Sequence, residues 1–361
     1  MNKGWKEIFF FNFIKLNRGF DLPNNKIEAG NYPVIASTSI KAYHKNFKVI
    51  APCVTTGRSG SLGVVQYVNQ DSWPLNTTLY VKDFKKNDPK FVYYFLQTMD
   101  FDTFNSGAGV PTLNQNHLHH IKIQIPKDIT HQKRIASILS AYDDLIEVNN
   151  KRIELLEQSA RELYKEWFVR MRFPNYQNTK FNKGIPEGWK EVYLKEIADF
   201  TYGKMPQKEL IKRHGYPIFS GYNTVGFYPF YMFPNPTLVI VARGVGGTGD
   251  IKITPQKCWL TNLSIAILLK NYSHLYYFYY LLSNDNLRIL DSGAAQSQIT
   301  IDSLSKYKIL HANNEIIDSF NNKILSLLYQ IENLQKQNQE LTAIRDRLLP
   351  RLMSGKLEVK A

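Results

Sequence analysis

The sequence contains few cysteines, which excludes a disulfide framework. Only two, Cys53 and Cys258, occur in 361 residues, and their spacing does not match that of a zinc site. Free thiols are typical of a reducing compartment, so we expect a cytoplasmic protein.

Long hydrophobic runs are also missing. The most apolar stretch near the N-terminus, residues 8–14, is far too short to cross a bilayer. The Trp-Lys-Glu motif that precedes it returns in mid-chain, which has no reason to happen for a targeting segment. We therefore assign this stretch to a protein core and expect no membrane partner.

Motifs for catalysis, metals and cofactors are equally scarce. The Gly-rich stretch 56–63 lacks the Lys-Ser/Thr ending of a P-loop. Its counterpart 242–249 is followed by strand-like residues, where a dinucleotide fingerprint needs a helix. The cluster His117, His119 and His120 has no accompanying cysteine or paired carboxylate, which favours a solvated turn over a metal site. We predict a chain without catalytic residues that binds no metal and no cofactor of its own.

The sequence does contain a long internal repeat. Four segments return in the same order at a shift of 184 to 186 residues: Trp5–Ile8 as Trp189–Val192, Arg58 as Arg243, Trp73 as Trp259, and Asn105–Gly109 as Asp291–Ala295. Such a period is far longer than that of a solenoid, so each copy is large enough to form a domain with its own core.

Each copy is followed by a long heptad pattern, over residues 131–170 and 314–349. Sustained heptads without internal Pro or Gly predict a coiled coil, which we expect Pro350 and Gly355 to end. One polar residue, Asn149 or Asn338, lies centrally in each seam. We expect these two side chains to meet across an antiparallel pair and set its register, the alternative being that both are merely tolerated.

Both helices also carry apolar residues outside the seam. A two-stranded coil cannot bury them, so either the globular domains or partner helices must cover them. These residues are Leu145, Val148, Leu155, Tyr164, Phe168 and Leu328.

Strand and helix signals alternate within each copy. Strands are expected at Val49–Ile50, Val64–Val65, Leu79–Val81, Ile121–Ile125, Leu238–Val241 and Ile265–Leu269, and helices at Pro89–Met99 and around His274–Leu282. The sequence therefore predicts an α/β protein with two pseudo-symmetric mixed α/β domains, separated by two long helices that form an antiparallel coiled coil. The expected boundaries are 1–130 and 173–312 for the domains, 131–172 and 313–353 for the helices, and 354–361 for a tail.

The net charge of +14 is concentrated in the two copies. Residues 1–130 and 173–312 each carry +6, whereas the helical segments are nearly neutral. An even division of positive charge between two domains favours a polyanion, and double-stranded DNA in particular, that both domains bind. The alternative is a generally basic protein without such a partner.

Polar loops and basic-aromatic segments supply the candidate DNA contacts. Amide, hydroxyl and guanidinium groups read base edges, and Lys contacts phosphate, although any one of these residues could be ordinary surface polarity. The candidates are Lys41, Tyr43, Lys48, Arg58, Ser59, Thr112, Asn114 and Gln115 in the first copy, and Lys204, Gln207, Lys208, Tyr222, Asn223, Arg243, Gln296, Ser297 and Gln298 in the second.

Several of these segments resemble one protein family along nearly the whole chain. They are Arg58–Gly63 with Trp73–Asn76, Gly107–Asn114, Gln132–Leu139, Leu163–Phe168, Pro186–Lys190 and the closing Arg345–Gly355. Together they are similar to the specificity subunit of type I restriction-modification enzymes.

The resemblance implies two target-recognition domains that each read one half of a bipartite, asymmetric DNA site. The helices would act as a ruler and dock two modification (methyltransferase) subunits, which carry S-adenosylmethionine, and restriction subunits (ATP-dependent translocase and endonuclease) would join them. The Gly loops depart from the usual Gly-Ser-Thr-Gln pattern, with Val110-Pro111-Thr112 in the first copy and Ala295-Gln296-Ser297-Gln298 in the second. Those differences concern which bases are read.

Three other functions remain open at the level of sequence. The chain could be a coiled-coil DNA-binding scaffold for an orphan methyltransferase without restriction. It could modify DNA itself, which would need a cofactor loop and a catalytic motif. A coiled-coil scaffold without DNA would leave the charge of both copies unexplained.

Overall fold

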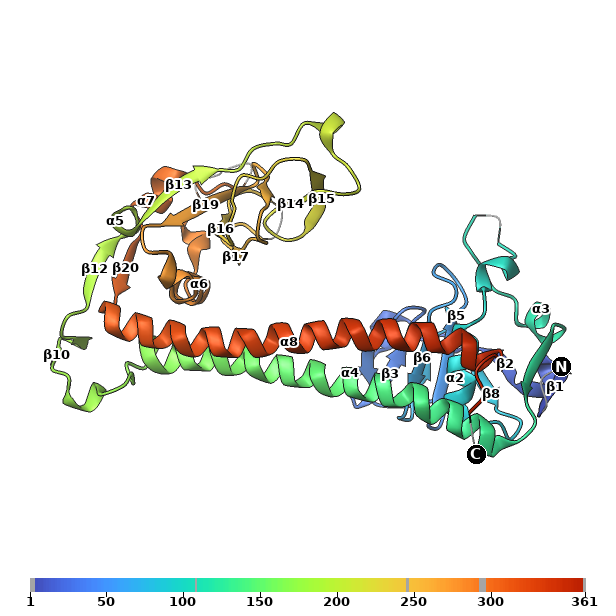
Figure 1. Cartoon of the computed structure of the whole chain (residues 1–361). Helices are drawn as coiled ribbons and strands as arrows, with labels where there is room; N and C mark the ends of the chain where they lie inside the picture. The colour runs from blue at the N-terminus through green and yellow to red at the C-terminus, as the bar shows by residue number, and fades with distance from the viewer. Residues whose placement is uncertain (1–3, 108, 245–246, 292–296, 360–361) are drawn as a thin grey trace. The chain divides into compact units, whose positions relative to one another are not determined.

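The computed structural model describes residues 4–107, 109–244, 247–291 and 297–359, which form two compact units (Figure 1). Unit 1 comprises Met1–Lys151 and Gln335–Ala361, and unit 2 comprises Arg152–Leu334. The two long helices, α4 (Ile129–Tyr164) and α8 (Asn314–Met353), each contribute to both units.

Unit 1 is a mixed α/β domain. Its four-stranded antiparallel sheet has the order β2 (Lys15–Arg18), β8 (Thr78–Asp83), β5 (Cys53–Gly57), β6 (Val65–Val68). A three-stranded sheet has the order β4 (Ile40–His44), β3 (Tyr32–Ile35), β7 (Trp73–Pro74), and β1 (Trp5–Phe9) pairs with β9 (Lys122–Pro126). The helices are α1 (Phe10–Phe13), α2 (Pro89–Gln97) and α3 (Gln115–His119).

Unit 2 repeats this topology strand for strand. The four-stranded sheet has the order β13 (Ala198–Tyr202), β19 (Ser264–Leu269), β16 (Leu238–Val241), β17 (Ile251–Ile253). The smaller sheets are β15 (Thr224–Tyr228), β14 (Tyr216–Phe219), β18 (Trp259–Leu260), and β12 (Lys190–Tyr193) with β20 (Lys308–His311). Helices α5 (Leu194–Ile197), α6 (Leu275–Asn284) and α7 (Ile301–Ser305) complete it. The structure thus confirms two pseudo-symmetric α/β domains.

The structure departs from the expected strands at one place in unit 1. Val49 makes only a single bridge, to Ser72, and Ile50 is 73% exposed, so the strand expected at Val49–Ile50 is wrong. The true central strand is β5, whose five residues are all buried. A strand covered on both faces does not alternate between apolar and polar residues, so its pattern was not recognisable.

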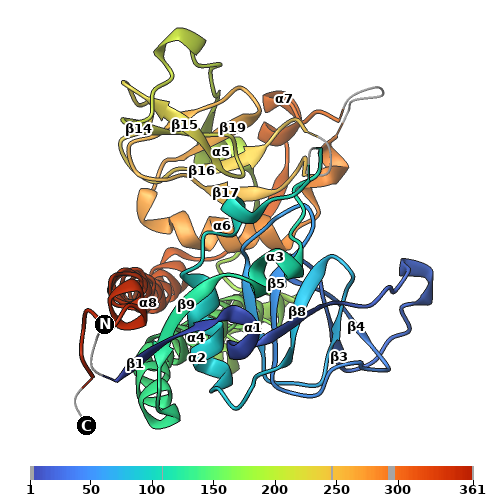
Figure 2. The ribbon, with the colours of Figure 1, turned by 90° about the vertical axis from the view of Figure 1, so that its right-hand side faces the viewer.

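Each unit has its own core, built mainly from the motifs that recur along the chain. Trp5 is buried in the core of unit 1 with Phe10 and Phe13 of α1, and the end of α8 adds Leu352 and Met353. In unit 2, Trp189 is buried in the equivalent core, within 5.7 Å of the Phe168 ring centroid. Both chain termini belong to unit 1, where β1 and the last turn of α8 share one core (Figure 2).

The long helices pair antiparallel, as predicted. In unit 1, Asn149 of α4 contacts Asn338 of α8, and Asp143 contacts Arg345 farther along. In unit 2, Tyr164 packs edge-on against Phe320 at 6.2 Å. Higher numbers on one helix thus meet lower numbers on the other. After Tyr164, the chain continues as one π-helical segment, η3 (Lys165–Val169).

The C-terminus of α8 differs partly from expectation. Pro350 lies inside the helix, so the expectation that it ends the helix is wrong; in the last turn its missing N–H removes a single backbone bond. Gly355 does cap the helix, with a φ of 69° and an amide that donates to the Leu352 carbonyl at 3.2 Å. This is the left-handed cap that glycine supplies without a Cβ penalty.

The apolar residues outside the seam fall into two groups. Tyr164, Phe168 and Leu328 pack into the core of unit 2, so the domain itself covers them. Leu145, Val148 and Leu155 remain 47%, 51% and 61% exposed. Among the helices of the described chain, none is sufficiently long and apolar to cross a membrane.

Candidate nucleic-acid interface

In unit 1, two loops join at the end of β5 into a short antiparallel ladder. Ser59 and Thr112 face each other as a bridge pair. The Leu113 amide donates to the Arg58 carbonyl at 2.8 Å, and the Gly60 amide donates to the Pro111 carbonyl at 3.1 Å. The Gly-rich segment and the polar loop, far apart in sequence, therefore form one surface element, which we call the platform of unit 1 (residues 58–60 and 111–113).

Unit 2 contains the same platform at the end of β16 (residues 242–243 and 298–299). Arg243 and Gln298 form the bridge pair, and the Ile299 amide donates to the Ala242 carbonyl at 2.9 Å. The sequence repeat thus marks a repeated element of the surface, not only of the core.

The two arginines of the repeat are not equivalent. The amides of Arg58 and Ser59 both donate to the Thr77 carbonyl, at 2.8 and 3.2 Å, and those of Ala242 and Arg243 both donate to the Leu263 carbonyl, at 2.8 and 3.1 Å. The residue of unit 1 that occupies the place of Arg243 is therefore Ser59. The expected equivalence of Arg58 and Arg243 is wrong by one position, because matching like residues selected a shift of 185 where this part of the fold has 184.

The one-residue difference separates the environments of the two arginines. Arg58 is half-buried, and its Nη1 donates to the Asn76 carbonyl at 3.5 Å. Arg243 is exposed on the platform. Along an extended chain neighbouring side chains point to opposite faces, so Arg58 and Ser59 cannot serve the same face.

A polar side chain at the base of each polar loop fastens it to the platform. In unit 1, Asn105 Oδ1 accepts from the amides of Gly107 and Thr112, each at 2.9 Å. In unit 2, Asp291 Oδ1 accepts from the Gln298 amide at 2.7 Å, and its other oxygen accepts from the Ser297 hydroxyl. Asn105 and Asp291 were recognised in the sequence only as part of the repeat; the Asn/Asp-Ser-Gly motif was the signal of this role.

A hairpin tip lies beside each platform. In unit 2 it is the turn between β14 and β15, where the Ser220 amide donates to the Asn223 carbonyl at 3.1 Å. Tyr222 and Asn223 are both exposed there. Tyr222 packs so closely on Gly247 that a Cβ at that glycine would lie 1.3 Å from the tyrosine hydroxyl. Burial raises the pKa of Tyr222, and the nearby Asp250 adds to the shift.

Unit 1 has an equivalent tip between β3 and β4, which the sequence did not reveal. The Ala36 amide donates to the Ser39 carbonyl at 2.9 Å, as Ser220 does to Asn223. Thr38 and Ser39 thus occupy the places of Tyr222 and Asn223, and both are exposed. Two small hydroxyl residues had no distinguishing pattern, so only the pairing of the strands identified them.

The basic and aromatic candidates of unit 1 lie on or after β4. Lys41 Nζ donates to Asn24 Oδ1 at 2.6 Å, and Tyr43 is 52% exposed. Lys48 Nζ lies 5.0 Å from the centroid of the Trp73 ring, a cation–π distance. These side chains are accessible at the edge of the three-stranded sheet.

The corresponding candidates of unit 2 occupy a different element, the segment after β13. Lys204, Gln207 and Lys208 are exposed, and Lys208 begins the short helix η5 (Lys208–Leu210). The Trp259 indole donates to the Lys204 carbonyl at 2.7 Å, which holds this segment against β18. The two units therefore present their cations from different places on a shared fold.

The remaining candidates have local roles. Asn114 caps α3 by accepting from the Asn116 amide at 3.0 Å, and Gln115 is the first residue of that helix. Ser297 is fastened to Asp291, as described above. Gln296 lies outside the described residues.

The histidine cluster is not the solvated turn that was expected. His119 is half-buried at the end of α3, and its Nε2 accepts from the Leu16 amide at 3.2 Å. Its ring packs 5.3 Å from that of Phe11. Burial lowers the pKa of His119, and Lys15 and His120 lower it further. Within the described ranges, no group of three or more His, Cys, Asp or Glu side chains is placed to hold a metal ion.

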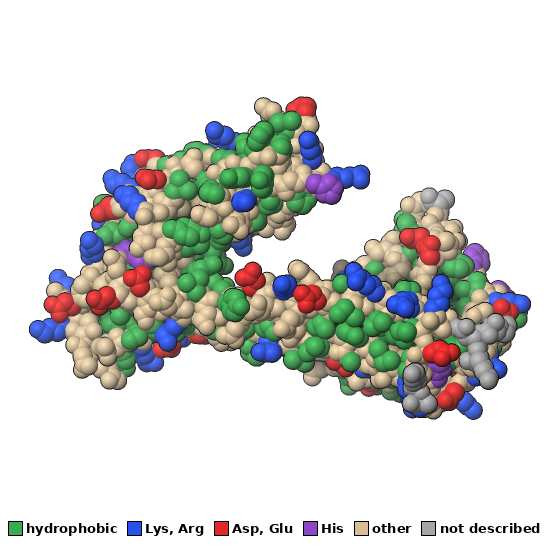
Figure 3. All heavy atoms as spheres, in the orientation of Figure 1, with side chains coloured by type: hydrophobic (Ala, Val, Ile, Leu, Met, Phe, Trp, Pro, Cys, Tyr) green, Lys and Arg blue, Asp and Glu red, His purple; other side chains and the backbone are tan. Residues whose placement is uncertain are grey.

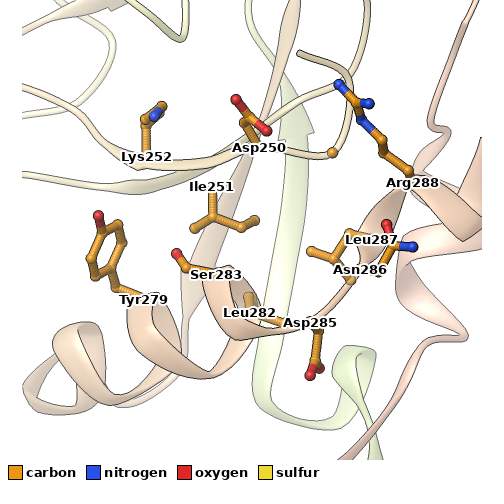
Figure 4. Close-up of a pocket in the computed structure, with 11 residues that line it drawn as sticks. Asp250, Ile251, Lys252, Tyr279, Leu282, Ser283, Asp285, Asn286, Leu287 and Arg288 are labelled. Carbon is orange, nitrogen blue, oxygen red and sulfur yellow. The ribbon is translucent and has the colours of Figure 1, made fainter. Parts of the chain in front are cut away.

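A cavity of about 310 Å³ lies next to the Gly-rich loop of unit 2, between β17, α6 and the segment after α6 (Figure 4). Its carboxylates do not form a catalytic pair. Asp285 points away from Asp250 (Figure 4) and accepts from the Tyr307 hydroxyl at 3.0 Å. Burial raises the pKa of Asp285, although the Tyr307 bond opposes that shift. Arg288 donates to the Thr248 carbonyl at 3.2 Å, so this region supports the Gly-rich loop.

Lys and Arg side chains are spread over the surface of each unit, whereas acidic and basic side chains alternate along the long helices (Figure 3). A surface of positive charge, amides and hydroxyls is suited to contacts with phosphates and base edges. The described parts of both units thus resemble a binding surface more than a reaction centre.

Comparison with known proteins identifies the family. The family described as "Type I restriction modification DNA specificity domain" matches this chain twice, over residues 2–158 and 186–343. The chain belongs to the type I DNA specificity family. The two matches cover the two halves of the internal repeat.

Individual members of the specificity family are similar over much of the chain. The specificity subunit of the type I restriction enzyme MjaIX from Methanocaldococcus jannaschii is 27% identical over 75% of this chain and 69% of its own length. The HindI specificity subunit from Haemophilus influenzae is 20% identical over 96% of this chain and 94% of its own. In fold, the crystal structure of an S subunit from M. genitalium superposes with a TM-score of 0.65, at 20% identity, over 97% of this chain and 96% of that one.

Proposed function

We propose that this chain is the non-catalytic DNA-specificity subunit of a type I restriction-modification complex, with each unit reading one half of a bipartite double-stranded DNA site. The observation that carries the proposal is the repeated platform with different side chains. Ser59 faces Thr112 in one unit and Arg243 faces Gln298 in the other. One fold with two sets of polar groups suits two different base sequences.

The long helices would set the spacing between the half-sites. Helices α4 and α8 have 36 and 40 residues, or about 54 and 60 Å at ~1.5 Å per residue. Their antiparallel contacts define a register in which residue 151 of α4 lies opposite residue 336 of α8. If the two units enter grooves on one face of DNA, the half-sites are roughly one helical turn apart, ~34–36 Å.

The exposed apolar side chains of the helices would dock two modification subunits, and restriction subunits would join them. In unit 1 these side chains are Leu145 and Val148 on α4 and Ile344 on α8. In unit 2 they are Leu155 on α4 and Leu325 and Tyr329 on α8. Apolar residues that a helix pair leaves exposed are typical of a surface that another helix covers.

The chemistry of modification would come from those partners, which bind S-adenosylmethionine; no cofactor is assigned to this chain. We place this function in the cytoplasm, where buried thiols such as Cys53 and Cys258 stay reduced.

The ruler is tested by inserting one heptad after Lys151 and one after Gln335, which keeps the seam in phase. The variant and the native chain are each expressed with their modification subunit, and the methylated sites of the host DNA are sequenced. We expect two unchanged half-sites with a longer gap between them. An unchanged gap would refute the ruler. If the native chain directs methylation to no bipartite motif, the proposed function itself is wrong.

A further inference from the structure

The platforms place one pair of side chains at the same position in each unit. Ser59 and Thr112 form this pair in unit 1, and Arg243 and Gln298 form it in unit 2. We propose that this bridge pair determines base specificity: Arg243 and Gln298 read adjacent purine bases in the second half-site, and Ser59 with Thr112 takes the same place over the first. The inference rests on the proposed function, because it names the reading residues of the two units.

The geometry of the bridge brings the two side chains together. In unit 1, backbone bonds flank the pair on both sides, between Leu113 and Arg58 and between Gly60 and Pro111. A pair flanked in this way is the close type in an antiparallel ladder, with Cα atoms ~4.5 Å apart and both side chains on one face. One base pair, or two neighbouring ones, is within reach of both side chains.

Both platforms are held in place before any ligand binds. Each is bonded along one edge to the end of a central strand, through the Thr77 carbonyl in unit 1 and the Leu263 carbonyl in unit 2. Each is fastened along the other edge by a side-chain acceptor, Asn105 or Asp291. Rigid supports of this kind reduce the ordering cost of recognition and favour discrimination between bases.

The side chains assign different chemistry to the two units. Arg pairs with the O6 and N7 acceptors of guanine, and Gln pairs with the N6 donor and N7 acceptor of adenine. Ser and Thr are short and make single contacts with several bases. The exposed Arg243 beside Gln298 therefore predicts purines on one strand of the second half-site.

The decisive variant is Arg243→Lys, because lysine keeps the charge but loses the planar bidentate donor. The full chain is used to select bound sequences from a randomised duplex pool, and its affinity is then measured for the selected site and for single-base changes. We expect Arg243→Lys to lose roughly 5- to 150-fold of its discrimination at one position of the second half-site. The first half-site should not change.

A matched loss of charge elsewhere in unit 2 is the control. Lys252→Ala removes a cation that lines the cavity beside the Gly-rich loop and should leave discrimination intact. If Arg243→Lys behaves like native protein while Arg243→Ala weakens binding to all sequences equally and flattens the salt dependence, Arg243 holds phosphate and the inference is wrong.

The reciprocal variant transplants the pair into unit 1. Ser59→Arg with Thr112→Gln should introduce a purine preference in the first half-site and leave the second unchanged. Second-half-site selection serves as the folding control, because it depends on unit 2. An unchanged first half-site in a variant that still binds would overturn the inference. If the native chain selects no bipartite sequence, the proposed function has failed instead.

Discussion

Asn149 of α4 and Asn338 of α8 meet side by side in the helix seam. The Asn149 Nδ2 donates to Asn338 Oδ1 at 2.9 Å, and the Asn338 Nδ2 donates onward to Asn150 Oδ1 at 2.8 Å. Asn149 is only 2% exposed. A buried amide pair of this kind favours one alignment of two helices over others, because any shift separates the partners.

The register role of this pair predicts a strong coupling between the two asparagines. Asn149→Leu alone leaves the Asn338 oxygen without its donor and should cost about 1–3 kcal/mol of unfolding free energy. Adding Asn338→Leu should restore most of that loss, because both polar groups are then gone. Chemical denaturation of both single variants and the double variant measures the coupling; Asn333→Leu, an exposed change on α8, is the control. Strictly additive effects would show that the pair is only tolerated.

The clamp at Asn105 predicts a half-site-specific defect. Asn105→Leu removes the acceptor of two backbone amides and should loosen the first platform, so that discrimination in the first half-site falls and that in the second is kept. Asn105→Asp keeps the acceptor and copies the group found at Asp291, so it should retain function. Selection from a randomised duplex pool measures both. Equal behaviour of the Leu and Asp variants would argue against the clamp.

The exposed apolar residues of α4 predict separable partner and DNA binding. Leu145→Glu with Val148→Glu should abolish co-purification of the modification subunit, because it places two charges in an apolar contact. Both residues are exposed, so stability should change by no more than ~0.5 kcal/mol each. Affinity of the chain for its DNA site should persist. Gln158→Glu, an exposed position farther along α4, is the control. Normal co-purification of the double variant would exclude this surface.

The environment of His119 predicts an acid-sensitive unit 1. Burial lowers its folded-state pKa below the ordinary value of 6.5, so the unfolded chain binds the proton more readily. The stabilisation from neutral His119 is complete above about pH 6.5 and is lost as the pH falls through the lowered folded-state pKa. His119→Gln keeps an acceptor for the Leu16 amide without titrating. Melting temperatures from pH 7.5 to pH 5 should fall less for this variant than for the native chain, and parallel curves would refute the assignment.

Several features followed from the sequence because they depend on local periodicity. Heptads located both long helices and their central asparagines, since a helix repeats its face every three to four residues whatever surrounds it. The 184-residue recurrence of the Trp-Lys-Glu motif revealed two domains, because duplicated cores keep the same large side chains. The family resemblance rested on these same segments, and the family comparison confirms it.

Other features depended on which strands pair, and here only the tertiary structure decided. Side chains alternate between the two faces of an extended chain, so an error of one residue reverses a face. Matching Arg58 to Arg243 made that error, and the backbone bonds to Thr77 and Leu263 correct it to Ser59. Likewise, Ser59 meets Thr112, and Arg243 meets Gln298, across more than 50 residues of intervening chain. The sequence by itself determined that the chain holds two copies of one domain and two long helices; the long-range strand pairing decided which side chains each copy presents, because that pairing is not encoded in any local pattern.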